Sequence, residues 1–362
     1  MPLLPASPTR PSPHRRLSRV LAAVAGVCIL AGMFLPSPYV IESPGPVFDA
    51  LGTVRSGTTT KHVIEIRGAR TYSTSGSLDV LTVSVLGSPD QQPNWLEVIG
   101  AWMRSDTAVT PQEAVYEPGT TTRQAEAENR LMMRQSQQAA SAAALRELGY
   151  TVPATASVAG FAEGRRAATG LRTGDQIRTV DGVALRSTEQ LRRAASRHGS
   201  AGTAATLVIR RDGTDRELRI RPAKISGQWV LGVELEWSYQ LPVSVTVHLQ
   251  GVGGPSAGLI FALSMIDRLT PGSLTGGQQV AGTGTMSASG TVGAIGGIRQ
   301  KMIAASRNGA RWFLAPRSNC SEVTGHIPKG MHVVAVGSLA QARKAVQTIA
   351  STKSAAGLPT CS

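Results

Sequence analysis

Aromatic and acidic residues are scarce in this sequence. Aromatics make up 4% of the 362 residues, and 23 Asp and Glu face 37 Lys and Arg, giving a formal net charge of +14. Such a charge indicates nucleic-acid binding when basic residues gather into a stripe interleaved with aromatics. Here they are scattered, so we expect no nucleic-acid partner. The length exceeds what one hydrophobic core fills, and it predicts several domains.

Metal-ligand patterns and nucleotide-binding loops are also missing. The chain has three cysteines and six histidines, none spaced as in a metal site, so we expect neither a metal nor another cofactor. After Glu236 the only carboxylates are Asp267 and Glu322, which leaves few partners for a Ser-His-Asp triad. No G-x-x-x-x-G-K-[ST] sequence occurs, so no ATP-binding loop of that type is expected.

What the N-terminus does contain is a basic cluster followed by an uncharged run. Four arginines precede Val20–Leu35, and the stretch continues through two prolines to Ile41. This pattern predicts a cytoplasmic segment at 1–19 and a transmembrane anchor at 20–41, with the bulk of the chain outside the cell membrane. A cleaved signal peptide is the alternative.

In the rest of the chain, the composition and the hydrophobic pattern change several times, which predicts a multidomain α+β fold. Turn-rich strand patterns and then a helical, Ala-rich stretch occupy 42–150. Residues 151–236 form the next expected domain. Strands alternate with helices over 237–352, as in an α/β domain, and 353–362 is a short tail.

The segment 151–236 resembles a PDZ domain. The resemblance rests on GLRTGDQIRTVDG, which supplies Gly170, Gly174, Asp175, Asp181 and Gly182. It implies binding of an extended peptide at a sheet edge. The candidates for peptide contact are Phe161, Ala162, Gly164 and Arg165.

The sequence GVGGPSAGLIFALSMIDRL contains the strongest candidate for a nucleophile. Glycines allow a tight turn, Pro255 suits a first helical turn, and Ser256 then lies at the start of an apolar helix. The N–H groups and dipole of such a helix can stabilise an oxyanion. Taken alone, Ser256 is better explained as a helix N-cap.

Lys301 is the candidate base. It lies in AIGGIRQKMIAA between apolar helix positions, where burial favours a neutral amine that can accept a proton. Taken alone, this lysine is also explained as an exposed helix charge. His248 is the histidine nearest to Ser256 in sequence, and its strand position favours a structural role.

Together these motifs resemble the proteolytic domain of Lon-type (S16 family) serine peptidases. PSAG at 255–258, Thr283 with Gly284, the glycine turn at 290–297 and Lys301 follow in that family's order. The resemblance implies Ser256 as nucleophile, Lys301 as base and Thr283 hydrogen-bonding near it. Gly254, Pro255 and Ala257 would then support the oxyanion site.

Two positions depart from the Lon-type pattern. Gly253 and Thr285 stand where acidic residues are common in that family, which bears on substrate preference. The whole arrangement resembles bacterial membrane-anchored PDZ and Lon-domain proteases. This implies ATP-independent serine endopeptidase activity on peptides or unfolded proteins, and it leaves a homo-oligomer open.

Alternatives to a peptidase remain at this stage. A catalytically inactive PDZ scaffold at the membrane is one, and a small-molecule kinase related to galactokinases is another, although such a kinase needs a Mg²⁺-binding carboxylate. If the chain is exported, Cys320 and Cys361 can form a disulfide. If it is not, both stay free thiols.

Overall fold

The computed structural model describes residues 13–56, 59–162, 164–249 and 252–361. The chain divides into two compact units, one made of Met1–Pro44 and Val83–Ala125, the other of Gly45–Thr82 and Glu126–Ser362. The region 42–150 is therefore not a domain of its own, because it contributes to both units.

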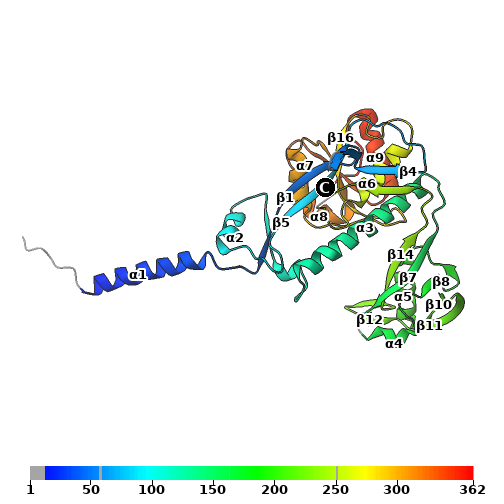
Figure 1. Cartoon of the computed structure of the whole chain (residues 1–362), viewed down its shortest axis with the longest axis horizontal. Helices are drawn as coiled ribbons and strands as arrows, with labels where there is room; N and C mark the ends of the chain where they lie inside the picture. The colour runs from blue at the N-terminus through cyan, green and yellow to red at the C-terminus, as the bar shows by residue number, and fades with distance from the viewer. Residues whose placement is uncertain (1–12, 57–58, 163, 250–251, 362) are drawn as a thin grey trace, which may run out of the picture. The chain divides into compact units, whose positions relative to one another are not determined.

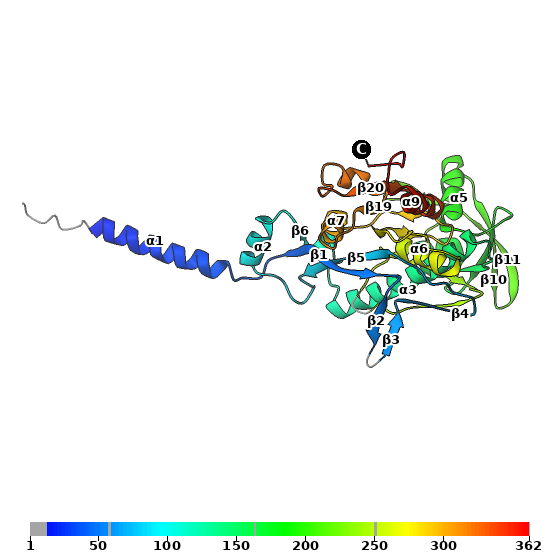
Figure 2. The ribbon, with the colours of Figure 1, turned by 90° about the horizontal axis from the view of Figure 1, so that it is seen from above.

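The smaller unit contains two helices and an antiparallel strand pair (Figures 1 and 2). These elements are α1 (Pro13–Gly32), α2 (Trp95–Trp102), the start of β1 (Tyr39–Asp49), β6 (Ala108–Pro111) and a 3-10 helix (Gln112–Ala114). β1 pairs with β6 in the register Tyr39↔Pro111 to Glu42↔Ala108. The first turn of α2 carries a capping box, in which Asn94 and Glu97 bond each other's backbone N–H groups.

Within the described part of the chain, no helix combines the length and the apolar character needed to cross a membrane. The prediction of a spanning anchor at 20–41 is thus not supported. α1 ends at Gly32 and β1 begins at Tyr39, because Pro36 and Pro38 cannot continue a helix.

The larger unit is built on parallel strands in the spatial order β20, β19, β16, β5, with β1 next to β5. The parallel strands are β5 (Ser77–Leu86), β16 (Gln279–Gly282), β19 (Trp312–Pro316) and β20 (His332–Val336). The helix patterns expected here are confirmed by α6 (Gly258–Leu269), α7 (Ile298–Arg307) and α9 (Leu339–Thr352). The short helix α8 (Cys320–Val323) was not expected.

Alternate residues of each parallel strand belong to different core clusters, as the two faces of a sheet require. Leu314 of β19 packs with α6 and α9 in one cluster, whereas Phe313 packs with Ile298 and Met302 of α7 in the other. Helices α6 and α7 therefore cover opposite faces. The first cluster also takes in the C-terminal half of α3 (Thr122–Glu147).

Short antiparallel pairs complete this unit. They are β2 (Thr53–Ser56) with β3 (Thr59–His62), β4 (Ile64–Arg67) with β15 (Ser244–Val247), and β17 (Thr285–Met286) with β18 (Val292–Gly293).

Between α3 and β15 the chain forms a separate six-stranded sheet, here called the inserted domain (residues 154–239), in which, among the described residues, β9 pairs only with β8. Its spatial order is β11-β10-β8-β7-β14, and β14 therefore has one unpaired edge. Its elements are β7 (Ala154–Phe161), α4 (Arg165–Thr169), β8 (Gln176–Val180), β9 (Val183–Ala184), α5 (Thr188–Ala201), β10 (Ala205–Arg211), β11 (Thr214–Ile220), β12 (Ala223–Ile225), β13 (Gln228–Val230) and β14 (Val233–Tyr239). Its first and last residues, Ala154 and Tyr239, are paired directly.

Candidate functional site

Ser256 lies in a tight turn just before α6. The helix begins at Gly258 with Ala257 as its N-cap, so Ser256 precedes the cap and is not itself the capping residue. Gly254 has φ of 80°, a left-handed conformation that glycine adopts without steric cost. The side chain of Ser256 is partly exposed, whereas the residues that follow it are buried.

The segment after β16 holds this turn in place. The carbonyl of Ser256 accepts hydrogen bonds from the Gly284 N–H at 2.8 Å and from the Thr283 hydroxyl at 3.1 Å. The Leu259 N–H in turn donates to the Gly284 carbonyl at 3.0 Å. A Cβ on Gly258 would lie 2.9 Å from the Met286 N atom, so this close packing requires glycine. The turn is thus fixed at the carboxyl end of β16.

Lys301 is buried, with 3% of its surface exposed, and it is the fourth residue of α7. The N-terminus of α7 is fixed beyond the end of β19, because the Ile295 N–H bonds Asn319 Oδ1 at 3.0 Å. Carboxyl ends of parallel strands form one edge of a sheet, which is where α/β folds place their ligand sites. The structure therefore brings the starts of α6 and α7 to the same edge, although the helices cover opposite faces.

Helix α3 braces the Ser256 turn, a role that the sequence did not indicate. The hydroxyl of Ser136, which is 5% exposed, donates to the Pro255 carbonyl at 2.9 Å. The Gly254 N–H donates to the Asn129 carbonyl at 3.4 Å. Ser136 lies 119 residues from Pro255 in the chain, and a lone serine in an Ala-rich helix gives no signal of this contact.

His248 has a carboxylate partner from a distant strand. Its Nε2 lies 3.0 Å from Glu65 Oε2, because β15 pairs with β4. The hydrogen bond from His248, followed by that from Arg67, lowers the pKa of Glu65. The sequence argument considered only carboxylates after Glu236, and it therefore missed this pair.

The two carboxylates that follow Glu236 in the sequence, Asp267 and Glu322, accept hydrogen bonds from groups other than histidine. Asp267 accepts a 2.6 Å hydrogen bond from the Leu274 N–H, and burial raises its pKa to about 6. Glu322 accepts from the Asn319 side chain at 2.8 Å. Neither hydrogen bond involves a histidine.

In the inserted domain, β7 is paired on both sides, by β8 and β14. Among the described residues, β14 and β11 are the two end strands of the sheet. β14 is the end strand that contacts α5, where the Trp237 indole donates to Thr188 Oγ1 at 3.0 Å. Phe161 ends β7 opposite Val233. The other peptide-contact candidates, Ala162, Gly164 and Arg165, follow it in the chain.

These candidates support the loop that leads into β14. Arg165 donates hydrogen bonds to the carbonyls of Arg221 and Leu231, and the Ala162 N–H donates to the Gly232 carbonyl at 3.2 Å. A peptide can add only to an unpaired strand. The geometry therefore favours β14 over the end of β7 as the peptide-adding edge.

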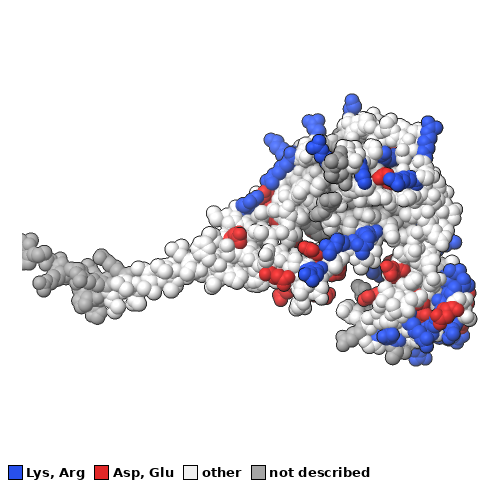
Figure 3. All heavy atoms as spheres, in the orientation of Figure 1, with Lys and Arg blue, Asp and Glu red and all other residues white. Residues whose placement is uncertain are grey.

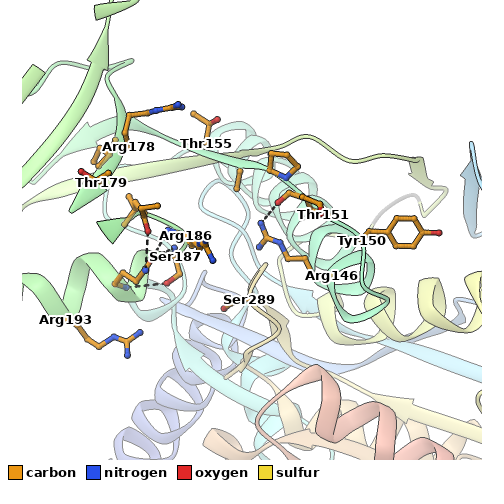
Figure 4. Close-up of a pocket in the computed structure, with 17 residues that line it drawn as sticks. Arg146, Tyr150, Thr151, Thr155, Arg178, Thr179, Arg186, Ser187, Arg193 and Ser289 are labelled. Atoms are coloured by element: carbon orange, nitrogen blue, oxygen red, sulfur yellow. Dashed lines mark hydrogen bonds between the residues drawn. The ribbon is translucent and has the colours of Figure 1, made fainter. Parts of the chain in front are cut away.

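A cavity of about 980 Å³ lies between the end of α3, strands β8 and β9, and the start of α5 (Figure 4). Four arginines and no acidic residue line it: Arg146, Arg178, Arg186 and Arg193. Arg146 is held by the Val152 and Ala288 carbonyls at 2.7 and 2.9 Å. Neither Ser256 nor Lys301 lines this cavity, so its volume does not mark the candidate catalytic site.

Cys320 and Cys361 are joined by a disulfide with an S–S distance of 2.07 Å. Cys361 is 5% exposed and belongs to the core cluster that includes α7. The last residues are thus attached to the core, and the Ala335 N–H also bonds the Pro359 carbonyl at 2.8 Å.

Comparison with known families agrees with this division of the chain. The model of the Lon protease (S16) C-terminal proteolytic domain matches residues 243–347, and that of the PDZ domain matches 163–221. The chain therefore contains a Lon-type proteolytic domain and a PDZ domain. The PDZ domain is the inserted domain, and the proteolytic domain carries Ser256, Thr283 and Lys301.

Curated relatives match about a quarter of the chain at modest identity. Lon protease 1 of Herpetosiphon aurantiacus is 38% identical over 85 residues, which is 24% of this chain and 10% of that protein. The Lon protease of Nitratidesulfovibrio vulgaris is 41% identical over 86 residues, 23% of this chain and 10% of that protein. The matched part thus spans about a tenth of each relative.

A solved structure, the PDZ domain of an SdrC-like protein from Listeria monocytogenes, is similar at 21% identity with a TM-score of 0.20. It covers 22% of this chain and 85% of that chain.

Proposed function

We propose that this chain is a serine endopeptidase in which Ser256 is the nucleophile and Lys301 the general base. The observation that carries the proposal is the shared sheet edge. Thr283 and Gly284 fix the Ser256 turn at this edge, and α7 places buried Lys301 in its first turn there. The presence of a Lon-type proteolytic domain over these residues supports the same reading.

The proposed reaction is acyl transfer to the serine. The neutral amine of Lys301 takes the proton of the Ser256 hydroxyl, and the oxygen attacks a peptide carbonyl carbon. The N–H groups of Ser256 and Ala257 would stabilise the tetrahedral oxyanion, since those of Gly258 and Leu259 bond Pro255 and Gly284. The Lys301 ammonium then protonates the leaving amine. Water, deprotonated by Lys301, releases the acyl group.

A fluorophosphonate probe and casein cleavage test this proposal. We expect Ser256→Ala to abolish both labelling and cleavage, and Lys301→Ala to abolish cleavage while the fold is retained. Lys301→Arg is the matched control, because it keeps a positive charge but cannot act as a base at neutral pH. Cleavage that survives in Lys301→Ala would refute the lysine as base.

His248 is the competing base, because its pairing with Glu65 is the arrangement that orients a histidine in catalytic triads. If Lys301 is the base, His248→Ala retains cleavage. Loss of cleavage in His248→Ala and Glu65→Gln, with activity kept in Lys301→Ala, would assign the reaction to a Ser-His-Glu arrangement.

The PDZ domain would bind the substrate at the free edge of β14. Its ends, Ala154 and Tyr239, are paired, so replacing residues 154–239 by a short Gly linker joins two neighbouring backbone positions. We expect this deletion to slow cleavage of unfolded proteins and to leave short-peptide cleavage unchanged. Peptide binding by a chain that never cleaves would instead support the inactive scaffold.

We also place this peptidase on the outer side of a cell membrane, attached through residues 20–35. The uncharged run, the arginines before it and the Cys320–Cys361 disulfide support this location. Cleavage would need no ATP, since the sequence lacks a phosphate-binding loop of the Walker type. A protease added to the outside of intact cells tests this location. Degradation of the chain supports the outer location, and protection of the chain contradicts it.

A further inference from the structure

Helix α2 exposes an apolar surface. Leu96, Ile99, Trp102 and Met103 are 47%, 36%, 57% and 85% exposed. We call these four residues the apolar face of α2. Leu96, Ile99 and Trp102 are three positions apart and Met103, the C-cap, follows Ile99 by four, which puts them on neighbouring parts of one helical surface. The opposite side of α2 packs Val98 and Ala101 against Ile41. Of the apolar face, Trp102 also contacts this cluster through Tyr39.

The apolar face continues into the segment that leaves α1. The Leu96 N–H donates to the Met33 carbonyl at 3.0 Å, and the Trp95 N–H donates to the Leu35 carbonyl at 3.3 Å. Phe34 and Leu35 are themselves 67% and 60% exposed. Both views of the ribbon show α2 beside the end of α1 (Figures 1 and 2). The start of α2 is therefore tied by backbone hydrogen bonds to the end of the N-terminal helix.

Helix α1 exposes apolar side chains of its own. Val20, Leu21, Val24, Val27 and Leu30 are 54% to 65% exposed. At about 1.5 Å per residue, the part from Val20 to Gly32 is about 20 Å long, against about 30 Å for a bilayer hydrocarbon core. A membrane contact made by α1 alone would thus be limited in depth.

The chemistry of this surface favours lipid over a protein partner. No charged residue lies between Val20 and Leu35 (Figure 3), and basic residues precede that run, a distribution that suits acyl chains beside anionic head groups. Tyr39 packs edge-on against Trp95 and Trp102 at 5.6 and 6.0 Å. Tyr and Trp of this kind are enriched where membrane proteins meet the head-group region.

We propose that α2 lies in the interfacial layer of a lipid bilayer, with its apolar face in the acyl chains. This contact would be a second one beside α1, and it rests on the proposed membrane attachment through residues 20–35. The capping box and the Arg104–Asp106 ion pair, 3.0 Å apart, would then flank the buried face at head-group depth.

Site-directed nitroxide labelling of the full chain tests this inference. In a Cys28→Ser background, a nitroxide at Met103→Cys is measured in vesicles of phosphatidylcholine and phosphatidylglycerol. We expect its relaxation to respond several-fold more to oxygen, which concentrates in lipid, than to a water-soluble nickel chelate. Glu113→Cys is the matched control, an exposed and charged position of the same unit in the 3-10 helix Gln112–Ala114, and it should show the reverse preference.

A third label separates the possible failures. If Val24→Cys reports lipid and Met103→Cys reports water, the α2 contact is wrong while attachment through α1 stands. If both labels report water, the proposed attachment itself is wrong. Spin–spin broadening at Met103→Cys together with a water-like response would assign the face to a second copy of this chain and overturn the lipid contact.

Discussion

The hydroxyl of Thr283 donates a 3.1 Å hydrogen bond to the backbone carbonyl of Ser256. Thr283 is 1% exposed and directly follows β16, so its position is set by the sheet. The resemblance to Lon-type domains placed this threonine near Lys301, and the structure adds that it contacts the backbone of Ser256. Thr283 is therefore a positioning residue for the Ser256 turn.

Thr283→Val should slow peptide cleavage by removing this hydrogen bond while keeping the side-chain shape. One such bond is worth about 1 kcal/mol, or roughly a fivefold loss in kcat/KM. Thr283→Ser retains the hydroxyl and should cleave a fluorogenic peptide nearly as fast as the wild type. Equal rates for the Val and Ser variants would mean that the bond does not position the nucleophile.

Ser136→Ala should impair both stability and cleavage. It removes one of the two hydrogen bonds to the Pro255 carbonyl, the other coming from the Gly258 N–H at 3.4 Å, and one such bond contributes about 0.5–1.5 kcal/mol. The matched control is Ser141→Ala on the same helix, because that hydroxyl bonds the Gln137 carbonyl of its own helix at 2.7 Å. Denaturant unfolding and fluorogenic-peptide cleavage measure the two effects. If Ser136→Ala and Ser141→Ala had the same stability and the same cleavage rate, Ser136 would not hold the Ser256 turn in place.

The buried carboxyl of Asp267 should make stability depend on pH. Burial raises its pKa from 3.8 to about 6, so between these values the folded chain keeps a proton that the unfolded chain releases. Stability contributed by this group therefore falls as pH rises from about 4 to 6, by about 2 kcal/mol or less. Asp267→Asn, which can still accept from the Leu274 N–H, should lack this fall.

Denaturant unfolding of both proteins at pH 4 and pH 7 in detergent measures the Asp267 effect. The wild type should lose stability relative to the variant on going to pH 7. A relative gain would mean that the carboxyl titrates below its ordinary range.

Removing the disulfide should destabilise the proteolytic domain. Cys320 and Cys361 are 41 residues apart, and a cross-link over such a loop contributes about 2–4 kcal/mol. The double Ser variant should unfold at lower denaturant concentration than the wild type. Cys28→Ser is the control, since Cys28 is exposed and unpaired. Unchanged stability of the double variant would show that the tail packs without the bond.

Local sequence pattern was enough to predict α6, α7, β19 and β20, because their apolar periodicity and glycine boundaries are contained within each segment. It was misleading at the N-terminus, where an uncharged run was read through Pro36 and Pro38 as one helix. The strand that follows begins at Tyr39 because proline stops the helix. The sequence prediction relied on hydropathy and gave too little weight to the two prolines. The strand order of the PDZ sheet was not predicted, since β14 follows β7 by more than seventy residues and yet pairs with it.

By itself the sequence determined which residues have suitable chemistry: a serine in a glycine turn, a lysine among apolar helix positions, and a threonine between them. Only the tertiary structure decided which distant residues form hydrogen bonds around them. Ser136 reaches Pro255 across 119 residues, and Glu65 reaches His248 across 183. Contacts at such separations depend on how strands pair and helices pack, and no short segment encodes that pairing.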